Sequence, residues 1–380
     1  MKQIERFYAT CPRGLEKSLA AELTAMGASK AVHERGGVSF QGEWAIAYRA
    51  NLRSRLAGRI LWQVQKGSYR DETDLYQQAS ALPWWDWFTL EQSFKIRVTA
   101  INSPLKSINF AALRVKDAVC DAFRNQLGGR PDVELEHPDV TLHLILQRSD
   151  YYIYIDTSGE ALFKRGYRIK DVEAPLRENL AAGIIRLSGW TPEQPLLDPM
   201  CGSGTFLAEA AMIALNKFPG MGRDFAFQSL ANFDAKLWQQ ELRAAQAAEL
   251  KPKESLSLHG RDRESKAIEA TRANLKSIDL AKYISLEKMD SASGRAPASR
   301  GVIITNPPYG ERISDQRILK GVYERWGKRL KEDFGGWTAW ILSSDEELPK
   351  GLGMTPSREV KLFNGALAVK LYRFDIHTRQ

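Results

Sequence analysis

The chain has few of the residues that mark disulfide-rich, metal-binding or membrane proteins. Its 380 residues include three cysteines, Cys11, Cys120 and Cys201, which form no Cys-x-x-Cys pair, and five scattered histidines. This composition supports neither a zinc site nor a disulfide framework and fits a reduced, cytoplasmic setting. No apolar run approaches the roughly 20 residues that a membrane span needs, and residues 1–7 do not resemble a signal peptide. We therefore expect a globular protein that binds neither a metal nor a membrane.

The net charge gives a weaker indication of what the protein binds. The formal net charge is +8, which suits a polyanionic partner without requiring one. A chain of 380 residues is long enough for two or three domains, each with its own core.

A rigid polar loop carries the clearest chemical signal. The apolar run 301–304 is followed by Asn306, Pro307, Pro308 and Tyr309. The Asn306 side chain and the Pro307 carbonyl can accept the two N–H bonds of a planar amine. The second proline stiffens the turn, and Tyr309 offers a face on which a base can stack. These four residues are therefore predicted to hold a planar nitrogen for methylation.

A small-residue turn upstream is predicted to bind the methyl donor. The apolar residues 196–197 lead into an acid, a glycine-containing turn and an apolar helix, as in the first strand-turn-helix of a doubly wound α/β domain. The turn lacks the third glycine of a dinucleotide fingerprint and the Lys-Ser/Thr of a P-loop, so S-adenosylmethionine fits better than a nucleotide phosphate. The acid would hold the methionine ammonium group, and the cysteine is expected to be a packing residue. The predicted cofactor residues here are Asp198, Pro199, Cys201, Gly202, Ser203, Gly204 and Thr205.

Further acids stand where the next two predicted strands end. Asp262, with Glu264 beside it, follows the strand 255–260 and is suited to the ribose hydroxyls. Asp290 ends the strand 284–290 and is suited to the adenine amino group. Asn306 is expected to border the cofactor as well as the target.

These motifs together resemble the THUMP-domain RNA guanine-N2 methyltransferases. The likeness is carried by residues 198–205 and 306–312, by the opening 11–16, and by the entry into the catalytic domain at 162–168 and 174–182. It is strongest to the half of the bifunctional 23S ribosomal RNA enzyme that methylates guanine N2, and it covers nearly the whole chain. One departure is clear: the chain has Asp262-Arg263-Glu264 where relatives usually carry Asp-Ile-Asp.

The expected architecture is α/β. The resemblance and the alternation of strands and helices predict a Rossmann-like doubly wound methyltransferase domain preceded by ferredoxin-like and THUMP α+β domains. The expected boundaries are 1–67, 68–160 and 161–380. Residues 216–250 are interpreted as a helical insertion, and the tryptophan-rich run 83–88 as packing.

Two basic clusters are the predicted RNA contacts. Phosphate contacts would make binding salt-dependent and largely independent of sequence. The candidates are Lys106, Arg114 and Lys116 on a predicted helix, and Lys164, Arg165, Arg168 and Arg177 at the entry to the catalytic domain.

The resulting hypothesis is methyl transfer to the exocyclic N2 of a specific guanine in 23S ribosomal RNA. The target would flip out of its helix, and positioning would supply most of the rate, with no metal and no covalent intermediate. A transfer RNA guanine-N2 methyltransferase is the main alternative. A DNA adenine-N6 methyltransferase, a protein glutamine methyltransferase and a non-catalytic RNA-binding factor are the others.

Overall fold

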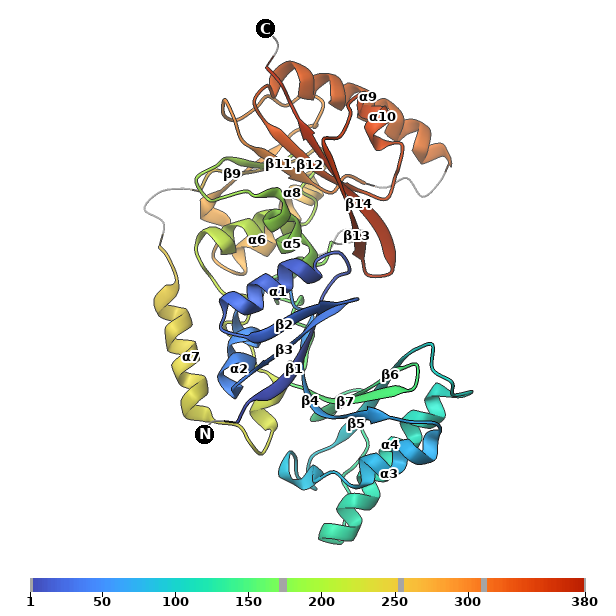
Figure 1. Ribbon diagram of the computed structural model, residues 1–380. Coiled ribbons are helices and arrows are strands. Elements are labelled where there is room, and N and C mark those ends of the chain that lie inside the picture. The colour runs from blue at the N-terminus through green and yellow to red at the C-terminus, as the bar shows by residue number, and fades with distance from the viewer. Residues whose placement is uncertain (1–2, 171–175, 252–255, 309–312, 379–380) are drawn as a thin grey trace. The chain divides into compact units, whose positions relative to one another are not determined.

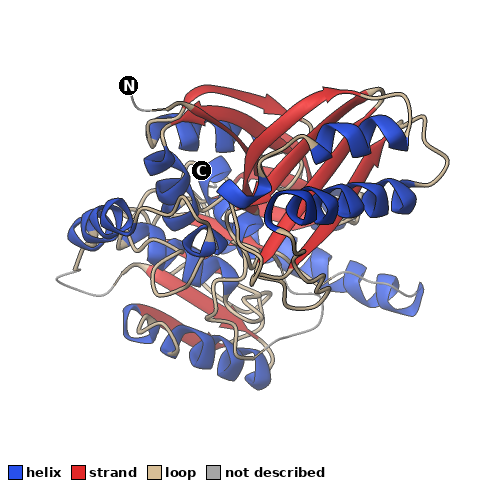
Figure 2. Cartoon of the chain, turned by 90° about the horizontal axis from the view of Figure 1, so that it is seen from below, coloured by secondary structure: helices blue, strands red, loops and turns tan. Residues whose placement is uncertain are grey.

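The computed structural model describes residues 3–170, 176–251, 256–308 and 313–378, which form two compact units (Figures 1 and 2). Unit 1 comprises Met1–Thr10, Ala20–Leu162 and Gly220–Ala244, and unit 2 comprises Cys11–Leu19, Phe163–Pro219 and Ala245–Gln380. Each unit therefore takes in a short segment from outside its main span.

Unit 1 is built on one seven-stranded sheet with the strand order β2-β3-β1-β4-β7-β6-β5. The long strand β4 pairs with β1 on one side and with β7 on the other, so it belongs to both expected N-terminal modules. The strands and α-helices between residues 5 and 156 are β1 Glu5–Thr10, α1 Glu16–Ala25, β2 Ser29–Glu34, β3 Gly37–Gly42, α2 Trp44–Arg53, β4 Arg59–Ser68, α3 Glu72–Ser80, β5 Phe94–Ile101, α4 Ile108–Leu127, β6 Val140–Gln147 and β7 Asp150–Asp156.

Helices α2 and α4 lie on the same face of this sheet. Trp62 of β4 contacts Trp44 of α2 with ring centroids 4.9 Å apart and Trp87 with centroids 5.5 Å apart. Phe88, in the same tryptophan-rich run, contacts Phe123 of α4. The run therefore packs against the core, as its sequence suggested, and Figure 1 shows α3 beside α4.

The segment 220–244 belongs to unit 1 because it packs on α2. Tyr48 contacts Phe227, Phe233 and Trp238 through its ring, and its hydroxyl accepts a hydrogen bond from the backbone of Asp234. Glu241 is buried and paired with two arginines of α2, Arg49 and Arg53. The predicted insertion thus contains a helix, α7 (Ala235–Ala248), whose Trp238 and Glu241 side chains have partners in α2.

Unit 2 is a doubly wound α/β domain, which confirms the predicted fold class. Its seven strands have the order β10-β9-β8-β11-β12-β14-β13, in which β10, β9, β8, β11 and β12 are parallel and β14 is antiparallel to its neighbours. The elements are α5 Glu178–Ser188, β8 Leu196–Asp198, α6 Thr205–Ala214, β9 Leu258–Asp262, α8 Ser265–Lys276, β10 Ile284–Lys288, β11 Val302–Thr305, α9 Ile313–Asp333, β12 Thr338–Ser343, α10 Leu348–Leu352, β13 Arg358–Asn364 and β14 Leu367–Asp375.

Two hydrophobic cores cover the two faces of this parallel sheet. Leu196 and Ile304 point into the core shared with α5, α6 and α8, whereas Leu197 and Ile303 point into the core shared with α9 and α10. A strand buried on both faces has no polar alternation, which explains the unbroken apolar run 301–304. The strand order reverses between β8 and β11, and ligands of such sheets bind at the carboxyl ends of the strands at this switch point.

Candidate active site at the switch point of the parallel sheet

One hydrogen bond joins the carboxyl ends of β8 and β11. Strands β8 and β11 are parallel neighbours, with Val302 opposite Leu196. Their carboxyl ends therefore coincide, and the Thr305 hydroxyl donates to the Asp198 carboxylate over 2.8 Å. Asn306 follows Thr305 directly, so the predicted target-binding loop begins beside the predicted cofactor turn.

Asp198 is an unusually weak acid for an aspartate. Its side chain is buried, and this burial raises its pKa to about 7. Bonds from Thr305 and from the Met200 backbone lower the pKa, while the negative charge of Asp262 raises it. A cationic ligand beside Asp198 would favour its ionised form.

Glycine is required at two positions, one in the turn after β8 and one on the neighbouring strand β9. Gly204 has φ +80°, and a Cβ there would approach the Thr271 side chain to 2.7 Å. On β9, a Cβ at Gly260 would lie 2.4 Å from Leu207. The close approach of α8 and β9 to the turn leaves no room for larger side chains, so the backbone itself lines this edge.

The turn is tied to the second strand through Asp262. One carboxylate oxygen of Asp262 accepts from the Gly202 backbone over 3.0 Å, and the other accepts from the Glu264 backbone over 3.0 Å. A carboxylate oxygen can accept more than one hydrogen bond, so both oxygens retain capacity for ribose hydroxyls. Glu264 is exposed and its side chain pairs with Arg263, which favours Asp262 as the principal ribose acceptor.

The remaining predicted cofactor residues take different positions. Pro199, Ser203 and Thr205 are buried in the turn, and Asp290 is exposed after β10, where it accepts from the Ala292 backbone. Cys201 is buried, and this burial raises the pKa of its thiol. A thiolate is disfavoured there, as expected for a packing residue.

The polar loop is anchored from the other side of the sheet. Pro307 is buried and Pro308 is exposed, and the Tyr323 hydroxyl of α9 donates to the Pro308 carbonyl over 3.3 Å. Burial raises the pKa of Tyr323 to about 12, so the hydroxyl keeps its proton. Tyr309, the predicted stacking residue, lies outside the described residues.

A residue that sequence reasoning missed, Asn274 of α8, links the cofactor turn to the entry segment. Its buried amide donates to the carbonyls of Ser203 and Lys170, and its oxygen accepts from the backbones of Ile169 and Lys170. An asparagine in a helix carries no signal of this role, because its partners are 71 and 104 or 105 residues away in sequence.

Two of the predicted RNA contacts are used inside unit 2 instead. The Arg165 side chain is 2% exposed and pairs with the fully buried Glu209 of α6. Arg168 pairs with the buried Glu178 and donates to the Thr205 hydroxyl. Buried, paired guanidinium groups are poorly placed for phosphates, so we assign both arginines to holding the entry segment against the cofactor turn. The single acid in the apolar helix 206–214 was the sequence signal for this network.

The other predicted RNA contacts lie nearer the surface. Lys106 and Lys164 are exposed. Arg114 lies over the Tyr76 ring and 3.9 Å from Asp117, which Lys116 also approaches. Exposed Arg177 lies over the Phe163 ring.

The residues of this edge fit S-adenosylmethionine. Asp198 offers a carboxylate for an ammonium group, Asp262 offers acceptors for ribose, and the Gly202–Gly204 backbone can approach a ligand closely. Arg168 donates to the Thr205 hydroxyl at the end of this turn.

The described residues contain neither a metal-type cluster nor a membrane-spanning helix. No cluster of three or more His, Cys, Asp or Glu side chains is arranged as a metal site among them. No helix in the described ranges is long and apolar enough to cross a membrane.

Three consecutive parts of the chain match known protein families. Residues 165–373 match the RMKL-like methyltransferase domain family, residues 69–156 match the THUMP domain, and residues 6–61 match the RlmL ferredoxin-like domain. The chain therefore belongs to the RMKL-like methyltransferase family, as its motifs indicated.

Individual relatives agree with this assignment. A Synechocystis protein provisionally named an RNA methyltransferase is 37% identical over 98% of this chain and 97% of its own length. The ribosomal RNA large subunit methyltransferase K/L of Syntrophotalea carbinolica is 39% identical over 98% of this chain and 53% of its own length. The K/L protein of Cellvibrio japonicus is 37% identical over 99% and 52%. The chain thus spans about half the length of these K/L relatives.

Solved structures show the same fold. SMU.472, crystallised with S-adenosylhomocysteine, superposes over the full length of both chains with a TM-score of 0.90 and 31% identity. A Listeria monocytogenes protein described as a predicted N6-adenine-specific DNA methylase has a TM-score of 0.90 and 28% identity, over 98% of this chain and 97% of its own. The family and the site together identify an S-adenosylmethionine-dependent methyltransferase.

Proposed function

We propose that the chain methylates the exocyclic N2 of a specific guanine in 23S ribosomal RNA. The observation that supports the proposal is the hydrogen bond between Thr305 and Asp198, which joins the strand that leads into Asn306 to the strand that leads into the predicted cofactor turn. The THUMP match and the names of the ribosomal RNA relatives support RNA as the substrate.

The chemistry requires the loop to orient a weak nucleophile. The lone pair of a guanine N2 is delocalised into the ring, so a catalyst must align it. The Asn306 oxygen and the Pro307 carbonyl would accept the two N–H bonds and aim the lone pair along one direction. S-adenosylmethionine supplies a methyl group that already carries a good leaving group.

The protein needs no strong base for this reaction. The nitrogen becomes cationic as it gains the methyl group and then loses a proton readily to water. Orientation and proximity therefore supply most of the acceleration. The rigid support of the loop, with Tyr323 on the Pro308 carbonyl and Thr305 on Asp198, suits that role.

The most direct test identifies which nucleic acid accepts the methyl group and then removes the single amine that should receive it. Purified enzyme and labelled S-adenosylmethionine are incubated with 23S ribosomal RNA, total transfer RNA and genomic DNA, and the product is mapped by mass spectrometry. We expect label only in 23S RNA, as N2-methylguanosine. Replacing the mapped guanine by inosine removes the N2 amine and nothing else, so transfer to that RNA should stop.

Other outcomes of the same assay identify the alternatives. Label in transfer RNA guanine N2 would establish the transfer RNA enzyme, and label in DNA adenine would establish the activity named for the Listeria protein. Undiminished transfer to the inosine-substituted RNA would exclude N2 as the acceptor.

A further inference from the structure

The β13–β14 hairpin of unit 2 extends past the edge of the parallel sheet at which Asn306 follows β11. Strand β12 ends at Ser343, which pairs with Lys370 of β14. Among the described strands, the three residues of β14 before Lys370 pair only with β13. At about 3.4 Å per residue they carry the hairpin roughly 10 Å beyond the end of β12. Because β11 and β12 are parallel, with Thr305 opposite Ile341, their carboxyl ends lie at one edge, and the hairpin projects from that edge (Figure 1).

A row of apolar side chains continues along this hairpin and leaves the core at its tip. Leu362 of β13 and Val369 and Leu371 of β14 belong to the core shared with α5, α6 and α8. Side chains alternate between the two faces of a strand, so Leu367 lies on the same face as Val369 and Leu371, one step nearer the turn. Unlike those residues, Leu367 is 47% exposed. The apolar row therefore ends in a side chain that the core does not cover.

The tip of the hairpin is narrow and has no polar side chain. Residues 365–368 read Gly-Ala-Leu-Ala, and all four are exposed. Gly365 has φ +65°, a conformation that glycine adopts without strain and that suits a tight turn. Turns are more often rich in Asn, Asp, Ser or Pro. A tip of small residues with one large apolar side chain has instead the shape of the wedges that proteins insert between stacked bases.

Two guanidinium groups lie beside the hairpin. Arg13 lies over the ring of Phe363, 3.5 Å from the ring centroid, and Arg177 lies over the ring of Phe163, 4.9 Å from the centroid. A Cβ at Gly365 would lie 3.2 Å from the Arg177 guanidinium, so this arginine borders the turn. Positive charge is therefore present on the strand β13 and at the turn.

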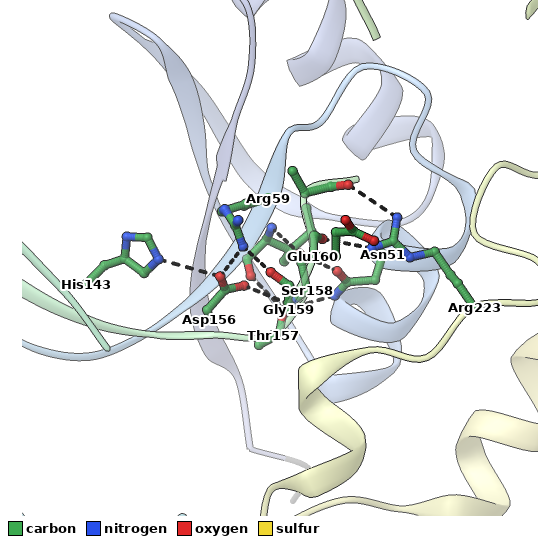
Figure 3. Close-up of polar contacts among 11 residues, drawn as sticks. Asn51, Arg59, His143, Asp156, Thr157, Ser158, Gly159, Glu160 and Arg223 are labelled. Atoms are coloured by element: carbon green, nitrogen blue, oxygen red, sulfur yellow. Dashed lines mark hydrogen bonds and ion pairs between the residues drawn. The ribbon is translucent and has the colours of Figure 1, made fainter. Parts of the chain in front are cut away.

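These arginines differ from a guanidinium group that stabilises the fold. Arg59 of unit 1 is paired with the buried carboxylate of Asp156 (Figure 3). Within the part of the chain that the structure describes, no carboxylate is paired with Arg13 or Arg177. Stacking on a ring orients a guanidinium group and leaves its N–H groups available to a phosphate.

We propose that Leu367 is a wedge that enters the base stack of the RNA when the target guanine flips into the active site. The inference rests on the proposed function and names the residue that stabilises the flipped state. Arg13 and Arg177 bind phosphates on the two sides of the target, and Leu367 fills the space that the guanine leaves. Unstacking a nucleotide is unfavourable, and burial of an apolar side chain in the gap offsets part of that cost.

A nucleic acid suits this tip better than a protein partner does. A stable protein interface buries roughly 800 Å² on each side, far more than one leucine between alanines can supply. Cations on both sides of a single apolar side chain match the phosphates on both sides of a single base.

The first measurement detects base flipping without methyl transfer. The guanine mapped by the labelling assay is replaced by 2-aminopurine in a short RNA stem-loop, and fluorescence is recorded as protein and S-adenosylhomocysteine are added. The fluorescence of 2-aminopurine changes when the base leaves its stack. We expect Leu367→Ala at saturating protein to give at most about a fifth of the native change, and Leu367→Met, which keeps a long apolar side chain, to remain close to native.

The matched control is Leu250→Ala, which truncates another exposed leucine of unit 2. It should give the native fluorescence change. Circular dichroism melting of Leu250→Ala and Leu367→Ala should match the native protein, because neither side chain is part of the core.

The second measurement separates a wedge from a structural residue. Methyl transfer is compared between a target guanine that is base-paired and one whose opposite nucleotide is abasic, so that this guanine is already unpaired. We expect Leu367→Ala to lower kcat/KM about tenfold on the paired target and only about twofold on the unpaired target. Equal losses on the two targets would assign Leu367 to structure and overturn the inference.

The flanking contacts are tested with Arg13→Gln and Arg177→Gln. Each variant should bind the RNA more weakly and lower the salt slope by about 0.9, as for one phosphate contact of a duplex. Arg243→Gln removes an exposed cation of α7 and should keep the native slope. Native slopes in Arg13→Gln and Arg177→Gln would contradict the role assigned to these arginines.

The outcomes separate this inference from the proposed function. If Leu367→Ala gives the native fluorescence change, the inference is wrong even when 23S RNA is methylated as proposed. If the labelling assay finds methyl groups in transfer RNA or in DNA, the proposed function is wrong, and 2-aminopurine at the labelled base tests Leu367 in the same way. On that substrate a native signal in Leu367→Ala would overturn the inference, and a lost signal would establish the wedge.

Discussion

The hydroxyl of Thr305 donates a 2.8 Å hydrogen bond to the carboxylate of Asp198, across 107 residues of sequence. This bond joins β8, which leads into the predicted cofactor turn, to β11, which leads into the predicted target-binding loop. Any change that weakens it should therefore alter cofactor binding and target orientation together.

Removing the Thr305 hydroxyl should change the pH dependence of cofactor binding. In Thr305→Val the pKa of Asp198 loses a lowering influence and should rise above about 7. Because the proposed partner of the cofactor ammonium group is the ionised carboxylate, the pH at which affinity is half-maximal should move upward. Titration calorimetry with S-adenosylhomocysteine from pH 6 to 8.5 measures this shift. Thr305→Ser keeps the hydroxyl and should show the native profile.

Asp198→Asn should stabilise the cofactor-free protein while weakening cofactor binding. The raised pKa of Asp198 means that the folded state binds a proton more tightly than the unfolded state, so its ionisation costs stability as pH rises from about 4 to about 7. Asparagine removes that cost, and we expect a gain of about 1–3 kcal/mol above pH 7. Thermal melts of both proteins should show a difference in melting temperature that grows from pH 5 to pH 7.5. A variant less stable than the native protein at pH 8 would contradict the assigned cause.

Asn274→Ala should destabilise unit 2 by about 3 kcal/mol, because it leaves several buried backbone groups without partners. Asn274→Asp keeps the acceptor for Ile169 and Lys170 but loses the donor to Ser203 and Lys170. Urea titration should therefore show a lower free energy of unfolding for Asn274→Asp than for the native protein. Cofactor affinity should fall in both variants. An alanine variant with native stability would show that these bonds contribute little.

Tyr323→Phe should lower kcat with little effect on cofactor affinity. The variant removes only the hydroxyl that donates to the Pro308 carbonyl, so the loop would be held less firmly while the cofactor turn is untouched. We expect a decrease in kcat of about tenfold, which corresponds to about 1.4 kcal/mol. Steady-state kinetics and calorimetry measure the two quantities, and equal losses in both would argue against a role confined to the loop.

The sequence was sufficient to predict the residues that follow the strands of the parallel sheet. Asp198, Asp262 and Asn306 stand at strand ends, and strand ends of a doubly wound sheet share one edge, so local patterns fixed their neighbourhood. The roles of Asn274 and Tyr323 were not predictable, because each depends on a partner brought close only by folding. Glu209 stood out as the single acid of an apolar helix, but its partner Arg165 could not be identified from the sequence. The same limitation applies to Arg165 and Arg168, whose acidic partners Glu209 and Glu178 lie in other elements of unit 2.

The packing of the segment 220–244 was also not predictable from the sequence. Its composition identified a helical insertion, but the partners of its buried Glu241 and Trp238 lie in α2, almost 200 residues earlier. Periodicity shows which side of a helix is apolar and does not show what covers it. The packing partner therefore came only from the structure.

The central claim is that Asn306 orients the acceptor amine without binding the cofactor strongly. Asn306→Ala is assayed with labelled S-adenosylmethionine and 23S RNA. It is predicted to lose methyl transfer while its affinity for S-adenosylhomocysteine stays within about twofold of native. The reason is that binding of the cofactor and orientation of the acceptor amine are separate contributions to the rate. Native transfer activity in Asn306→Ala, or loss of cofactor binding in step with activity, would contradict the account.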